Sequence, residues 1–119
     1  MIKDRLLNLP GEIEELKLGL FQKQEKASTI KEKLKMWELV EMDYISNELD
    51  EKGKAKFSND TKRQAELQRR KDESEDYFEH LQALRLLDNE IAVINIQLDK
   101  LYNEQGNLRA ICRLEGGLN

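Results

Sequence analysis

The chain has 119 residues with one proline, one cysteine and one histidine, and it is 37 % charged, 39 % hydrophobic and 6 % aromatic. This length fits a single domain, and this balance is typical of helices whose charged faces surround a narrow apolar seam, so we expect no thick globular core. The formal charge of -4 is too small to draw the whole molecule to membranes or nucleic acids, and one cysteine with one histidine excludes an internal disulfide and the usual zinc cluster.

The sequence also predicts a location. No apolar run approaches the roughly 18 to 20 residues that cross a bilayer, and the first ten residues lack the apolar centre of a signal peptide. A single cysteine suits a reducing compartment. We therefore expect a cytoplasmic protein that makes no contact with membranes.

The first predicted element follows a three-four spacing that starts at Ile2. Eleven of the fourteen positions on this stripe are apolar: Ile2, Leu6, Leu9, Ile13, Leu16, Leu20, Lys23, Ala27, Ile30, Leu34, Trp37, Glu41, Tyr44 and Glu48. Pro10 interrupts it chemically, because proline cannot donate a backbone hydrogen bond and suits the first turn of a helix. We expect a short helix over about 2–9 and a main helix over about 10–49, or one helix kinked at Pro10.

A charged connector over about 50–58 follows, and Gly53 within it marks the turn. Ser58 offers a hydroxyl as an N-cap, and Asp60 would lie in the first turn, where the helix dipole favours an acid. The second long helix is expected over about 59–113. Gly106 lies inside it, and we expect the helix to continue through this glycine, with a possible kink.

The second helix carries its own apolar stripe. From Tyr77, nine of eleven positions are apolar if cysteine is counted so: Tyr77, His80, Leu84, Leu87, Ile91, Ile94, Leu98, Leu101, Gln105, Leu108 and Cys112. Two such helices around one turn predict an all-α fold, a long antiparallel helical hairpin of the coiled-coil type. In this hairpin Ile13 would lie near Asn95, and Leu20 near Asp88.

The hairpin would not bury all of its apolar residues. Residues 81–98 are apolar on more than one side of the second helix. The part of the first helix that would lie beside them also has apolar residues outside its main stripe. Such a helix needs a further neighbour, so we expect self-association, most simply two hairpins in a four-helix bundle. The alternative is that single apolar residues lie exposed, as is common on surfaces. The predicted oligomer interface consists of Leu18, Phe21, Leu86, Val93 and Ile96.

A basic segment surrounds the turn. Residues 52–71 hold eight basic and two acidic side chains, and residues 72–79 then hold five acids. Opposite blocks of this kind usually pair along or between helices, but dense cations can also contact phosphates without reading sequence. The candidate nucleic-acid contacts are Lys54, Lys56, Lys62, Arg63, Arg69, Arg70 and Lys71.

The sequence offers little for catalysis. Acidic pairs three residues apart, Glu38 with Glu41 and Glu73 with Asp76, resemble those that hold magnesium in all-helical nucleotide pyrophosphohydrolases. With 24 acids in the chain, such pairs arise freely. We expect no catalytic residue, no metal and no cofactor.

The connector and the start of the second helix read Gly53-Lys54-Ala55-Lys56-Phe57-Ser58-Asn59 and then Arg63-Gln64-Ala65-Glu66-Leu67. This segment resembles short, mostly uncharacterised coiled-coil proteins of phages and prophages, whose genes lie among recombination and replication functions. The resemblance covers about 20 residues and supplies no catalytic residues. It implies a bacterial host cytoplasm and a protein partner of DNA metabolism.

These observations lead to one expected function and two alternatives. The expectation is a non-enzymatic, self-associating coiled-coil assembly or adaptor protein, accessory to phage DNA recombination or replication. The first alternative is a nucleic-acid-binding accessory whose basic turn contacts phosphates. The second is an all-α, metal-dependent nucleotide pyrophosphohydrolase.

Overall fold

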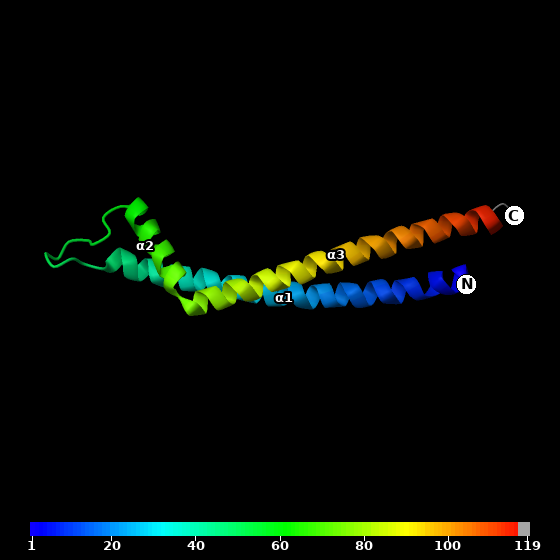
Figure 1. Ribbon diagram of the computed structural model, residues 1–119, viewed down its shortest axis with the longest axis horizontal. Coiled ribbons are helices and arrows are strands. Elements are labelled where there is room, and N and C mark those ends of the chain that lie inside the picture. The colour runs from blue at the N-terminus through cyan, green and yellow to red at the C-terminus, as the bar shows by residue number, and fades with distance from the viewer. Residues whose placement is uncertain (117–119) are drawn as a thin grey trace. The chain divides into compact units, whose positions relative to one another are not determined.

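The computed structural model describes residues 1–116, and this part of the chain forms three helices: α1 (Ile2–Asn47), α2 (Asp60–Glu73) and α3 (Glu75–Gly116) (Figure 1). The fold is therefore all-α, as the apolar stripes predicted. The chain divides into two compact units, which we describe separately. The terminal unit combines residues 1–26 with residues 87–116, and the loop unit comprises residues 27–86.

Helix α1 runs without interruption through Pro10. Leu9 and Ile13 flank the proline in the stripe, and their side chains are only 0 % and 6 % exposed. Packing at both positions compensates for the one backbone hydrogen bond that proline removes. The separate short helix over 2–9 is thus not formed, and these residues are the first turns of α1.

The core of the terminal unit lies between α1 and α3. Ile13, Ile94 and Leu98 are buried together, and partly buried leucines pack around them. Ile13 therefore meets α3 close to the predicted level of Asn95. Two ion pairs between the helices fix the same antiparallel direction: Arg5 Nε lies 2.6 Å from Glu104 Oε1, and Lys23 Nζ lies 2.5 Å from Glu90 Oε2.

In the loop unit the buried stripe of α1 leaves the predicted phase. Tyr44, expected on the seam, is 64 % exposed, whereas its neighbour Ile45 is completely buried. Leu34 and Ile45 are both buried and are eleven residues apart, which is three turns of a straight helix at 3.67 residues per turn. A strict seven-residue repeat assumes 3.5 residues per turn, so its predicted positions gradually move away from the buried face. The prediction that Tyr44 lies on the seam was therefore wrong.

The connector begins after Asn47, two residues before the predicted helix end, and folds into a tight turn. The Asp50 carboxylate accepts hydrogen bonds from the backbone N–H groups of Lys52 at 2.9 Å and Lys54 at 3.0 Å. Gly53 has a φ of 77°, which a residue without a Cβ adopts at no steric cost. The turn therefore lies at the predicted glycine.

The N-cap of α2 is Asn59 rather than the predicted Ser58. The Asn59 side-chain oxygen accepts a hydrogen bond from the backbone N–H of Lys62 at 2.9 Å, while Ser58 Oγ accepts one only from the Lys62 ammonium at 3.5 Å. Asparagine and serine are comparable caps, so spacing to the first turn decides between them. Asp60 lies in that turn, as predicted.

The second predicted helix is broken at Ser74. This residue has φ −87° and ψ 114°, an extended conformation that ends α2. Its Oγ accepts a hydrogen bond from the Tyr77 N–H at 3.1 Å and so caps the start of α3. As a result α2 turns away from α3 and lies across the last turns of α1 (Figure 1). The single helix over 59–113 was therefore a wrong prediction.

Helix α3 itself continues through Gly106 to Gly116, as expected. The positions of its predicted stripe from Tyr77 to Cys112 are all buried or half-buried. No helix within residues 1–116 combines the length and apolar character needed to cross a membrane.

Candidate functional site

The five residues predicted to form an oligomer interface are all on the surface of the single chain. In the terminal unit Leu18 and Phe21 on α1 are 58 % and 59 % exposed, and Val93 and Ile96 on α3 are 52 % and 68 % exposed. In the loop unit Leu86 is 61 % exposed. None of them packs in the core of the described hairpin, so each remains available to another molecule.

Exposed apolar side chains also occur in the loop unit beyond the prediction. Met36, Leu39 and Tyr44 on α1 and Phe78 on α3 are 57 % to 64 % exposed. Phe78 lies beside a hollow of about 360 Å³ whose lining includes Leu81, Tyr77 and Lys71. The type and spacing of these apolar residues could be seen in the sequence, but the helix break at Ser74 could not. This break creates the hollow between α2 and α3.

The predicted nucleic-acid contacts divide into two sets. Arg69, Arg70, Lys71 and Lys56 each lie within 3.3 Å of a carboxylate oxygen. The side chains of Lys54, Lys62 and Arg63 form no ion pair within the described residues, although the Arg63 side chain donates to the Phe57 carbonyl oxygen at 3.2 Å. The structure thus brings only part of the basic segment to the surface as unpaired charge.

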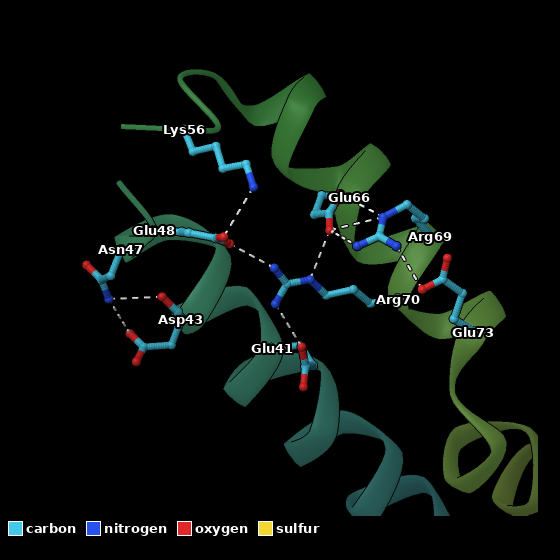
Figure 2. A network of polar contacts seen from close by, with 9 residues as sticks. All are labelled: Glu41, Asp43, Asn47, Glu48, Lys56, Glu66, Arg69, Arg70 and Glu73. Atoms are coloured by element: carbon cyan, nitrogen blue, oxygen red, sulfur yellow. Dashed lines mark hydrogen bonds and ion pairs between the residues drawn. The ribbon is translucent and has the colours of Figure 1, made fainter. Parts of the chain in front are cut away.

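Arg70 is the centre of the paired set (Figure 2). Its guanidinium reaches from α2 to Glu41 on α1, at 3.1 Å, and to Glu48 just after the end of α1, at 2.9 Å, and on its own helix it lies 3.0 Å from Glu66. The side chain is only 23 % exposed. A guanidinium with several donors in one plane can satisfy three acceptors at once, which makes this residue a clamp between α2 and α1.

The Glu66 carboxylate is the least exposed partner in this network, at 12 %. A hydrogen bond from Arg69 is the main cause that lowers the pKa of Glu66 to about 2, and Arg70 adds to it while burial opposes it. Arg69 also binds Glu73 at 2.7 Å. The network therefore keeps Glu66 ionised well into the acid range.

A second contact ties α1 to the start of α3. Glu38 accepts hydrogen bonds from the Tyr77 hydroxyl at 3.0 Å and lies 2.7 Å from Lys71 Nζ. The bond from Lys71 lowers the pKa of the Glu38 carboxyl below its ordinary value. The Trp37 ring packs on Tyr77 with 4.8 Å between the ring centres, which supports the prediction that both are packing residues.

The acidic pairs that suggested a magnesium site are engaged elsewhere. Glu38 pairs with Lys71, Glu41 with Arg70 and Glu73 with Arg69, while Asp76 lies 3.5 Å from the His80 ring. No group of three or more His, Cys, Asp or Glu side chains within residues 1–116 is arranged to hold a metal ion. The carboxylates of Glu38, Glu41 and Glu73 are directed to cations of the chain itself.

Comparison with known proteins adds no identity. No protein-family model matches the chain, and no curated protein or solved structure is significantly similar to it. The interpretation of its function therefore rests on the residues and contacts described above.

Proposed function

We propose that this chain is a non-enzymatic, self-associating assembly or adaptor protein. The observation that supports this proposal is the exposure of Leu18, Phe21, Val93 and Ile96 on the two outer faces of the terminal unit, at 52 % to 68 % each. Burial of one such side chain is worth about 1.5–3 kcal/mol, so two copies gain free energy by covering these positions. Its role is then to hold or space partner molecules.

The setting that we propose is DNA recombination or replication in a phage or prophage, with a protein of DNA metabolism as partner. The support is the resemblance of the segments Gly53–Asn59 and Arg63–Leu67 to short phage coiled-coil proteins. Most of the Gly53–Asn59 segment is exposed in the connector, where a partner can reach it.

The non-enzymatic part of the proposal is supported by the state of the acids. Three of the four carboxylates that suggested metal binding, those of Glu38, Glu41 and Glu73, have a cation of the same chain beside them, and displacing that cation would cost the ion pair. Mg²⁺-dependent release of phosphate or pyrophosphate from nucleoside triphosphates by the unmodified protein would contradict this part.

Phosphate contact by the basic segment is the weaker alternative. Four of its seven candidate residues are already paired: Arg69, Arg70 and Lys71 with acids of α1 or α2, and Lys56 with Glu48. Lys54, Lys62 and Arg63 remain for such contacts. We therefore prefer self-association.

Sedimentation equilibrium of the full chain over a wide range of concentrations tests the proposal. We expect a mass that rises to a multiple of the 14.0 kDa chain as concentration increases. A mass of 14.0 kDa throughout would contradict self-association.

A further inference from the structure

The outer side of α3 in the terminal unit carries a second seven-residue repeat, opposite to the one that packs on α1. Its positions follow each other at steps of four and three, and every one of them is exposed in the single chain. We call this set the outer stripe: Asn89, Val93, Ile96, Lys100, Asn103, Asn107, Ala110 and Leu114.

The composition of the outer stripe differs from that of the chain. One of its eight residues is charged, whereas 37 % of the whole chain is. A helix face that stays in water gains from charge, and this one instead carries aliphatic residues and asparagines. Asparagine at core positions of a coiled coil is the usual device that sets register at some cost in stability. The stripe covers about 39 Å at 1.5 Å per residue, enough for more than three repeats.

The corresponding stripe on α1 has a different character. It runs through Asp4, Leu7, Gly11, Glu14, Leu18, Phe21 and Glu25, so all of its charges are acidic. Two copies of this face would bring like charges together, which opposes their association. The two predicted interface pairs are therefore not equivalent, and the α3 pair, Val93 with Ile96, has the more compatible surroundings.

From this contrast we infer that the outer stripe of α3 is the interface with a second copy of this chain, and that the two α3 helices meet there in antiparallel directions. The inference rests on the proposed self-association. It adds which face of the chain forms the interface and in which direction the two α3 helices run. The Leu18 and Phe21 face of α1 is assigned to the outside of that dimer.

The direction follows from Lys100. In a parallel, in-register pair, Lys100 would lie against Lys100 of the second copy. In an antiparallel pair with Lys100 opposite Ile96, the lysine stem can cover the isoleucine and the ammonium can reach the neighbouring Asp99 of the second copy. Its own neighbour Glu104 is already bound by Arg5 at 2.6 and 3.0 Å. The antiparallel pair thus balances the charge at the centre of the interface.

The same register matches the amides. With Ile96 opposite Lys100, Asn89 of one copy falls opposite Asn107 of the other, and the pair occurs twice by symmetry. An amide has both donors and an acceptor, so two asparagines can satisfy each other across an interface. The register also places Asn103 opposite Val93, whereas a shift by one repeat towards the C-terminus would place Leu114 opposite Asn89 and Asn107 opposite Ile96, so that two amides instead of one face aliphatic side chains.

Paired variants test the face. All four positions are exposed, so Val93→Lys with Ile96→Lys, which would set a new ammonium against Lys100 of the second copy, and the matched control Leu18→Lys with Phe21→Lys should keep the helical circular dichroism of the unmodified chain. In sedimentation equilibrium we expect the α3 variant to remain at 14.0 kDa at concentrations where the unmodified chain and the α1 variant are dimers.

The outcomes separate the two proposals. An unmodified chain that is monomeric throughout would overturn self-association and, with it, this interface. An unmodified dimer combined with an α3 variant that still dimerises would overturn only the assignment to the outer stripe. Loss of the dimer in the α1 variant would show an interface that uses the α1 face and would also overturn it.

Disulfide cross-linking tests the direction in the full chain with Cys112→Ala. Asn89 and Asn107 are eighteen residues apart on one helix, about 27 Å, so cysteines at both positions cannot join within one molecule. In the double variant Asn89→Cys with Asn107→Cys we expect a dimer whose peptide map links position 89 to position 107. Cross-linking of the single variant Asn89→Cys to itself would instead require a parallel pair and would overturn the antiparallel inference.

Discussion

Some of the basic side chains that the sequence offered as candidate nucleic-acid contacts instead hold helices of the loop unit together. Arg70 is 23 % exposed and binds carboxylates of both α1 and α2. A charge that loses water at this level must be paired to be stable, and the same pairing keeps it from other ligands. At the scale of the residue, then, Arg70 and Lys71 of α2 act mainly as contacts between helices.

Glu66 should make this visible as a dependence on pH. Because its pKa of about 2 in the folded protein lies below the ordinary 4.5, its contribution to stability is complete above about pH 4.5 and is lost as the pH falls towards 2. Replacing Glu66 by Gln should lower the free energy of unfolding at pH 7 by about 1.5–3 kcal/mol, the usual contribution of a hydrogen bond to a charged group. The difference in the free energy of unfolding between the Glu66→Gln variant and the unmodified chain should vanish near pH 2.

Thermal unfolding followed by circular dichroism between neutral and acid pH measures this difference. Glu32→Gln is the matched control, because Glu32 is exposed on α1 and pairs with no cation in the described part of the chain. If Glu66→Gln unfolds at neutral pH at the same temperature as this control, the carboxylate does not stabilise α2.

At the scale of the elements, the break at Ser74 is the feature with the largest effect on the fold. Ser74 combines the end of one helix with the cap of the next, and its hydroxyl accepts the Tyr77 N–H. Replacing Ser74 by Ala removes that acceptor and should cost about 1 kcal/mol of stability. The Tyr77 amide should then exchange its hydrogen faster, which hydrogen exchange measured by NMR detects.

Ser28→Ala provides the comparison, since Ser28 is exposed inside α1 and alanine is the better helix former there. We expect no loss of stability in this control. A Ser74→Ala protein as stable as the control would mean that contacts other than the cap keep α2 and α3 apart.

Much of this arrangement was predictable from spacing alone. The apolar stripe of α3 from Tyr77 to Cys112 is on the inner side, and the turn falls at Gly53. The break at Ser74 was missed because neither proline nor glycine marks it. The signals present, a serine followed by Glu75 and Asp76 in a first turn, are weak beside a helical pattern on both sides.

The candidate site was predictable in part for a similar reason. That Val93 and Ile96 lie outside the main stripe follows from helix periodicity, and their exposure agrees with it. Periodicity does not predict which basic side chains lack an acidic partner, because this depends on the acids that a crossing helix brings near them. The pairing of Arg70 with Glu41 joins residues 29 positions apart through the bend at Ser74.

At the scale of the whole molecule, association and folding should be linked. A dimer that forms only from folded chains is stabilised by mass action, so its unfolding temperature rises with protein concentration. We expect this rise for the unmodified chain in differential scanning calorimetry, and we expect it to disappear in the Val93→Lys, Ile96→Lys variant. An unfolding temperature independent of concentration in the unmodified chain would contradict the linkage.

Helix α2 buries little apolar surface, which should decide when it detaches as the molecule unfolds. Leu67 is its one buried residue, the helix is 14 residues long, and helices of that length barely persist in water without support. Salt shortens the reach of its ion pairs, from about 30 Å at 0.01 M to about 3 Å at 1 M. We therefore expect detachment of α2 to be the first step of unfolding, and we expect it to occur more readily at high ionic strength.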